Sequence, residues 1–258
     1  MRRLIMEKPA EKQQKRRVLK TRSNPLMIRF ASFVATKKIT PNQISLLSIP
    51  FAILGMIGLW TWNLTEHRFL QITLLVIAII GIQGRLLCNL IDGMVAVEGG
   101  KVTKDGELYN DVPDRLTDIL FFVGLGLGVS KPFGLELGLT AGLLAVLTAY
   151  VRMLGLSMGT PAFFAGPLAK QHRMALLTAA IVATIIGLFY HLTDEILYTA
   201  LIVINIGALL TIINRLHLIR QYVLSRDDED DDVDGEERAE EAEEVKEKPS
   251  LEKDADHA

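Results

Sequence analysis

Residues 88–118 read CNLIDGMVAVEGGKVTKDGELYNDVPDRLTD and lie between two strongly apolar runs. This stretch gathers seven carboxylates, at Asp92, Glu98, Asp105, Glu107, Asp111, Asp114 and Asp118. Ionisable groups at or near membrane depth are costly, so they usually mark a functional site. The acidic stretch therefore predicts where the working part of the molecule lies.

The composition is that of a membrane protein. The chain has 258 residues, of which 50% are hydrophobic, and its mean hydropathy is +0.29. That is too apolar for an ordinary soluble domain. The single cysteine, Cys88, excludes an internal disulfide.

We expect an all-α integral membrane protein, because an unpaired backbone in lipid costs several kcal/mol per group. A helix needs about 20 apolar residues to cross the hydrocarbon core. Six stretches approach that length, and we predict transmembrane helices at about 41–60, 69–91, 115–130, 137–158, 174–191 and 196–214. The third is short and is expected to begin as a helix inside the acidic stretch.

The distribution of Lys and Arg predicts the orientation. Twelve of them precede Pro41, whereas the loops on the opposite side hold only Arg68 and Lys131. The positive-inside rule then places the N-terminus in the cytoplasm. With six spans the C-terminus and the loop at 92–114 are cytoplasmic too, and we expect a multi-pass protein of the plasma or inner membrane.

Three segments are expected along the chain. Residues 1–23 form a basic cytoplasmic segment, and 24–225 the transmembrane domain, whose first part, 24–38, resembles an amphipathic juxtamembrane helix suited to anionic headgroups. Residues 226–258 form a cytoplasmic tail. From Asp227 onward there are 17 acidic and 4 basic residues, a composition typical of disorder.

Spacing turns the acidic stretch into a candidate metal site. Asn89 and Asp92 are three residues apart, and Asn110, Asp114 and Asp118 follow at intervals of four, so each set shares one helix face. Carboxylate and amide oxygens suit Mg²⁺ or Mn²⁺, whereas zinc would require His or Cys. Four other acids are expected to be ordinary loop charges, namely Glu98, Asp105, Glu107 and Asp111.

These residues resemble the signature of the CDP-alcohol phosphatidyltransferase family, D-x-x-D-G-x-x-A-R, eight residues, then G-x-x-x-D-x-x-x-D. The chain reads N89-x-x-D92-G93-x-x-A96-V97, eight residues, then G106-x-x-x-N110-x-x-x-D114. The spacing matches at every element. Further similarity lies in TPNQIS at 40–45, in Arg152 late in span four and in AKQHR at 169–173, so the resemblance covers about residues 25–215.

The resemblance implies a transfer reaction. A CDP-linked alcohol, commonly CDP-diacylglycerol, is attacked at phosphate by a second, small alcohol, and CMP leaves. It implies Mg²⁺ or Mn²⁺ held by Asn89, Asp92, Asn110 and Asp114, with Asp114 as the base. It also implies substrate contacts at Asn42, Gly93, Ala96, Gly106, Arg152, Lys170 and Arg173. A homodimer is expected, with membrane lipids as further partners and no nucleic acid.

Three positions depart from the signature. Asn89 and Asn110 replace carboxylates, which should weaken binding of a second divalent ion. Asp111, Asp118 or Glu98 are candidates to compensate. Val97 replaces an arginine, for which Arg85, Lys101 or Lys104 are candidate substitutes. A register that used Asp114 and Asp118 as the last pair is disfavoured, because Asn110 would stand where glycine is expected.

Two other functions compete with the transferase. The departures are compatible with a non-catalytic relative that binds nucleotide-lipid or acts as a scaffold. Intramembrane prenyltransferases also hold Mg²⁺ and diphosphate between helices, but they typically need about nine spans and two Asp-rich motifs, which this chain does not offer.

Overall fold

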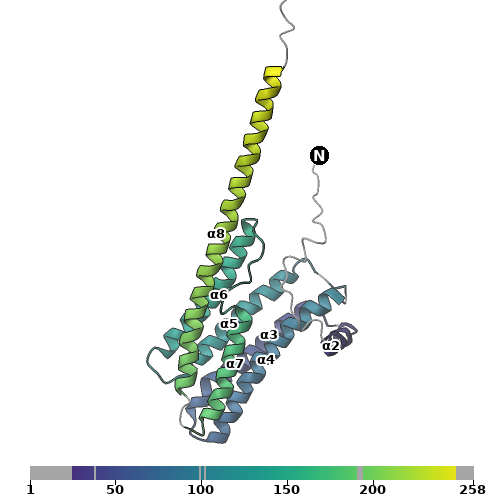
Figure 1. Cartoon of the computed structure of the whole chain (residues 1–258). Coiled ribbons are helices and arrows are strands. Elements are labelled where there is room, and N and C mark those ends of the chain that lie inside the picture. Colours follow the sequence, from purple (N-terminus) through teal and green to yellow (C-terminus); the bar gives the residue numbers. More distant parts are fainter. Residues whose placement is uncertain (1–24, 38, 99, 102, 191–193, 248–258) are drawn as a thin grey trace, which may run out of the picture.

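The computed structural model describes residues 25–37, 39–98, 100–101, 103–190 and 194–247, and within them the fold is a bundle of helices (Figure 1). The elements are α2 (Pro25–Ala35), α3 (Pro41–Thr61), η2 (Trp62–Leu64), α4 (Arg68–Glu98), α5 (Gly106–Gly128), α6 (Gly134–Ser157), α7 (Lys170–Gly187) and α8 (Asp194–Glu247). The described part of the chain contains no strand, which agrees with the all-α expectation.

Four segments in the described ranges are long and apolar enough to cross a membrane. They are Pro41–Leu64, Arg68–Val97, Gly134–Ser157 and Asp194–Arg226. By length and composition the chain is thus that of a multi-pass membrane protein. The helices at the third and fifth predicted spans, α5 and α7, have 23 and 18 residues. Their crossing of the membrane, and so the count of six, stays a prediction.

Helix α3 begins where the sequence places the start of the first span. The Oγ1 of Thr40 accepts a hydrogen bond from the Gln43 N–H at 3.2 Å, and Gln43 Oε1 accepts one from the Thr40 N–H at 3.0 Å. This reciprocal capping box satisfies two donors at the helix start. Pro41 follows as the first helical residue, a position that needs no amide hydrogen.

Helices α3, α4 and α5 pack at very short range through glycines. A Cβ built on Gly81 of α4 would lie 2.5 Å from the Gly55 Cα of α3, and one on Gly128 of α5 would lie 1.8 Å from the Leu59 carbonyl oxygen. Small residues allow backbones to approach in this way. Large side chains such as Trp62 and Phe121 fill the surrounding core. This close packing brings the end of α4 beside the start of α5.

The remaining helices complete the bundle around this core. Helix α6 packs between α5 and α8, and α7 lies against α8 and α4. Helix α2 packs on α4 through the buried Ala31, while Phe30 and Phe33 are exposed. Its predicted position on the membrane surface stays a prediction.

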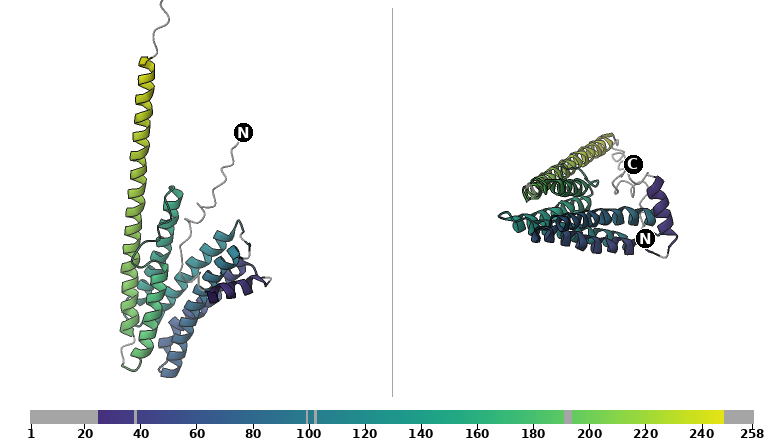
Figure 2. Two further views of the ribbon diagram at one scale, coloured as in Figure 1. Left: turned by 45° about the vertical axis from the view of Figure 1, so that its right-hand side comes forward. Right: turned by 90° about the horizontal axis from the view of Figure 1, so that it is seen from below.

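Helix α8 is longer than the sequence indicated. The last span was expected to end near 214, but the helical backbone runs to Glu247 and stands clear of the other helices in its second half (Figure 2). The region 226–247, expected to lack a fold, thus has a helical backbone. Extension of an existing helix needs no new nucleation, and residues 236–247 are rich in Glu, which favours helix. The boundary at 226 as a domain limit stays a prediction.

Replacing Gly81 by alanine should destabilise the fold. The new Cβ would meet only backbone atoms of α3, which cannot move without separating the helices. We expect a loss of about 1–3 kcal/mol, measured as a lower midpoint of thermal unfolding in detergent.

The matched control is Gly142→Ala in α6. Its Cβ would lie 3.5 Å from the nearest atom, which is ordinary contact, and alanine is the better helix former. Equal midpoints for the two variants would contradict the packing described for α3 and α4.

Candidate active site

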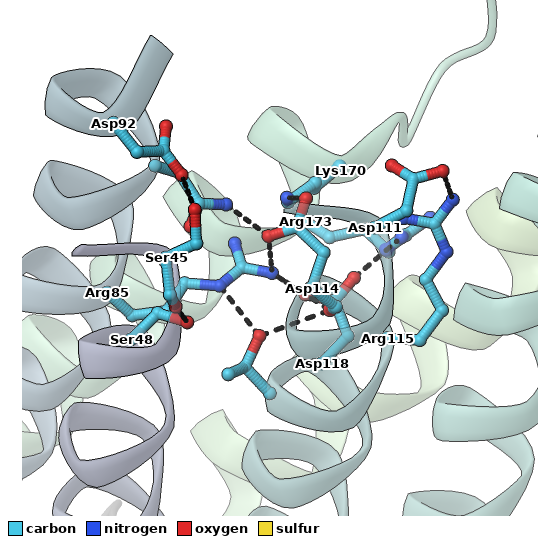
Figure 3. A network of polar contacts seen from close by, with 12 residues as sticks. Ser45, Ser48, Arg85, Asp92, Asp111, Asp114, Arg115, Asp118, Lys170 and Arg173 are labelled. Carbon is cyan, nitrogen blue, oxygen red and sulfur yellow. Dashed lines mark hydrogen bonds and ion pairs between the residues drawn. The ribbon is translucent and has the colours of Figure 1, made fainter. Parts of the chain in front are cut away.

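Asp92 is held at the C-terminal part of α4 by a neighbouring helix (Figure 3). Its side chain accepts hydrogen bonds from the Ser45 hydroxyl of α3 and from the Gly93 N–H at 2.5 Å, and the residue is 4% exposed. Ser45 lies in the TPNQIS segment, so the first predicted span contributes to the site through a residue that the sequence did not single out. The two contacts fix the orientation of the Asp92 carboxylate.

Asp114 of α5 joins three helices. Its two carboxylate oxygens accept hydrogen bonds from the Asn89 side-chain amide of α4 and from the Lys170 ammonium of α7. Arg85 Nη2 lies 3.4 Å from the same oxygen as Asn89. The structure therefore brings together four predicted site residues: Asn89 and Asp92 from α4, Asp114 from α5, and Lys170 from the start of α7.

Behind Asp114 lies a buried ion triad. Asp118 pairs with Arg85 at 2.6 Å and with Arg173 at 3.3 Å. Arg85 also donates to Thr117 Oγ1 at 2.8 Å, and Arg173 donates to Thr148 Oγ1 at 3.2 Å. Arg85 is completely buried and Arg173 is 2% exposed. Arg173 was predicted to bind substrate; that role stays a prediction, and the deep burial favours a supporting function.

A second ion cluster lies nearer the surface. Asp111 pairs with Arg115 at 2.9 Å and with Arg152 at 3.7 Å. The Arg152 guanidinium also lies over the Phe164 ring, with 5.5 Å to its centroid. Arg152 is partly exposed, with 22% of its side chain open to solvent, so it stands on the accessible side of the site. Asp111, expected to be a loop charge, instead lies on α5 with two arginine partners.

The other predicted site residues lie around this centre. Asn110 is one turn before Asp114 on α5, with an exposed side chain, while Gly93 and Ala96 are half-buried on α4. Gly106 is the first residue of α5. Hydrogen bonds, chiefly from the Thr103 side chain and also from Asn42, lower the pKa of Asp105. Asn42 thus contacts the loop before α5.

Of the candidates to replace the arginine missing at Val97, two have partners within the chain. Arg85 is committed to Asp118, and the Lys101 ammonium donates to the Lys37 carbonyl at 3.2 Å. Lys104 is exposed in the loop. Val97 itself is 57% exposed.

The donor set fits one hard cation. The described residues include no group of three or more His, Cys, Asp or Glu side chains that could hold a metal. Mg²⁺, however, is commonly held by only one or two protein carboxylates together with substrate phosphates and waters. Asp92 and Asp114, together with the Asn89 amide that contacts Asp114, meet that requirement for a single ion.

An apolar groove of about 260 Å³ opens beside this centre. It is lined from three elements, by Phe30 and Val34 of α2, Ile44 and Phe51 of α3, and Cys88 and Ile91 of α4, among others. Cys88 lies one turn before Asp92 on α4, so the groove reaches the helix face that carries the carboxylate.

The fold resembles solved structures of one enzyme. No family model matches the chain, and no curated protein matches it. Crystal structures of Mycobacterium tuberculosis phosphatidylinositol phosphate synthase (PgsA1), a CDP-alcohol phosphatidyltransferase, do match. With CDP-DAG bound, the TM-score is 0.61 at 15% identity, over 76% of this chain and 94% of that one. The complex with manganese and citrate gives 0.61 at 16%, over 75% and 88%, and the apo form 0.58 at 17%, over 73% and 93%. At such identities the likeness shows the fold alone.

Sequence reasoning missed the main role of Arg85. Its signal was nonetheless present, because an arginine inside an apolar span is costly and therefore needs a partner. Arg85 precedes Asn89 by four residues and Asp92 by seven, which places all three on one face of α4.

The triad makes Asp118 essential for stability. Asp118→Asn would leave two buried guanidinium groups without their counter-charge, and breaking a buried pair in this way costs about 3–5 kcal/mol. We expect much less folded protein after extraction, or a strongly lowered midpoint of thermal unfolding.

Asp111→Asn is the matched control, since it breaks the partly exposed cluster and such pairs contribute only about 0–1 kcal/mol. If Asp118→Asn were as stable as Asp111→Asn, the triad would not hold the helices together.

Proposed function

We propose that this protein is a membrane phosphotransferase of phospholipid biosynthesis. It moves a substituted phosphate from a CDP-alcohol to an acceptor alcohol and releases CMP. One observation carries the proposal: Asp92 and Asp114, the two aspartates kept at the spacing of the family signature, lie in one site at the junction of α3, α4, α5 and α7. The fold likeness to PgsA1 supports the same class.

The apolar groove favours a lipid as the donor. A CDP-linked lipid needs a polar site for its diphosphate and an adjoining apolar surface for its acyl chains. The groove lined by α2, α3 and α4 supplies that surface next to Asp92. We therefore assign CDP-diacylglycerol as the donor, which is also the ligand named for the neighbouring PgsA1 structure.

In the proposed reaction the acceptor hydroxyl attacks the phosphorus that carries the lipid. A new P–O bond forms as the P–O bond to CMP breaks. Asp114 accepts the hydroxyl proton; an ionised carboxylate has about four acceptor sites, so the contacts with Asn89 and Lys170 leave about two, one for the hydroxyl and one for a cation. Mg²⁺ or Mn²⁺, when bound by Asp92 and Asp114, would neutralise the diphosphate. The partly exposed Lys170 and Arg152 would attract its charge.

The proposal also assigns roles to the residues around the two aspartates. Asn42, Gly93, Ala96 and Gly106 would line the nucleotide site, and Asn110 would complete the metal environment. The protein would lie in the plasma or inner membrane with both termini in the cytoplasm, as a homodimer.

A non-catalytic binding protein is the second candidate, and one observation favours it. The Lys170 ammonium and the Asn89 amide both bind the Asp114 carboxylate, and they would weaken it as a base. Such a protein would bind CDP-lipid without turning it over.

CMP release by the purified protein in nanodiscs tests the proposal. With CDP-diacylglycerol, a panel of small alcohols and Mg²⁺ or Mn²⁺, we expect metal-dependent release with one alcohol and none with EDTA. Asp92→Ala and Asp114→Ala should each lower the rate by about a hundredfold or more, the size typical for loss of one essential transition-state contact.

Asp105→Ala is the control, because Asp105 is fully exposed in the loop and should leave the rate near that of the wild type. Normal turnover by either site variant would reject the assignment of that residue. Binding of CDP-diacylglycerol with no CMP release for any alcohol would select the non-catalytic function.

A further inference from the structure

We propose that this site takes one divalent cation per chain and that the Lys170 ammonium serves as its second positive charge. The inference rests on the proposed function, because it concerns the metal of that same site. It follows from how each carboxylate around the site is used, together with the positions at which asparagine replaces aspartate.

Two of the acids named as candidates to compensate for Asn89 and Asn110, Asp118 and Asp111, are engaged elsewhere. Asp118 is held between Arg85 and Arg173, both buried. Asp111 is held between Arg115 and Arg152. A metal ion would have to displace two guanidinium groups to use either carboxylate. Among the aspartates that the structure describes on α4 and α5, this leaves Asp92 and Asp114 for a metal.

Lys170 occupies one of the two oxygens of Asp114. It is the first residue of α7, and its ammonium contacts the oxygen of Asp114 that Asn89 does not contact. The Asp114 side chain is 11% exposed and that of Lys170 is 32% exposed. The Lys170 ammonium thus places a positive charge on the second oxygen of a largely buried carboxylate.

The positive charges of Lys170 and Arg85 beside Asp114 disfavour binding of a second divalent cation there. A divalent cation bound through the Asp114 oxygen that Lys170 contacts would lie beside the Lys170 ammonium, and Arg85 Nη2 is already 3.4 Å from the other oxygen. Cation affinity follows the count of charged ligands, and here the two asparagines have lowered that count. The one cation would be held by Asp92, Asp114 and the substrate's diphosphate, with the Lys170 ammonium as its positively charged neighbour on Asp114.

The inference is tested by counting bound Mn²⁺. Purified protein in nanodiscs is titrated with Mn²⁺ at a CDP concentration that saturates each variant, and free Mn²⁺ is read from its electron paramagnetic resonance signal. We expect one Mn²⁺ per chain for the wild type. Lys170→Met should tighten its binding about tenfold or more, because removal of one nearby charge typically shifts an ionic equilibrium by at least that factor.

Two control variants isolate the charge of Lys170. Lys170→Arg keeps the charge and should bind Mn²⁺ as the wild type does. Lys131→Met removes a charge just beyond the opposite end of α5, where Lys131 pairs with Glu195, and should leave the affinity unchanged.

Several results would overturn the inference. Two Mn²⁺ per wild-type chain, no Mn²⁺ at all, or an unchanged or weaker affinity in Lys170→Met would each do so. The wild-type count decides even if the methionine variant does not fold. A chain that binds one Mn²⁺, and binds it more tightly in Lys170→Met, but releases no CMP would refute the proposed function and leave this inference standing.

Discussion

The buried triad of Arg85, Asp118 and Arg173 is the constraint on which the site depends. It ties α4, α5 and α7 together at one level of the bundle. Charges so deeply buried are tolerated only when they are paired and hydrogen-bonded, and here Thr117 and Thr148 supply additional partners. Because the three helices are fixed relative to one another, Asp114, one turn from Asp118, is presented to Asn89 and Lys170 in a defined geometry.

The carboxylates of α4 and α5 have two different kinds of partner: some pair with arginines and stabilise the fold, and others lie at the candidate site. Asp118 and Asp111 are neutralised by arginines of the chain. Asp92 is instead oriented by a neutral hydroxyl and a backbone amide, and in the proposed function it would hold the cation. Asp114 stands between the two groups, since it is shared with Lys170. We therefore expect this site to bind a metal ion more weakly than a site with four aspartates would, because Asn89 and Asn110 carry no charge.

The sequence predicted much of this arrangement, because hydrophobic length, charge asymmetry and motif spacing are local properties. It placed the start of α3 at Pro41 and brought Asn89, Asp92 and Asp114 to one site. It could not assign partners across helices: Arg85 was a candidate substitute for the arginine missing at Val97, but it is buried against Asp118. Nor did it indicate that Ser45 would bind Asp92, since that contact depends on the glycine packing of α3 on α4. The helical continuation of α8 was not predicted, because the acidic composition after Asp227 indicates only that this segment is solvated. It does not determine whether the backbone is helical.

The central claim is that Asp92 and Asp114 hold a nucleotide diphosphate together with its cation. Equilibrium binding of CDP to the protein in nanodiscs, with Mn²⁺ and with EDTA, tests it most directly. The account predicts that CDP binds only with the divalent ion present, and that Asp92→Asn, which keeps the side-chain volume, abolishes this metal-dependent binding. CDP binding of equal strength in EDTA, or in the Asp92→Asn variant, would contradict it.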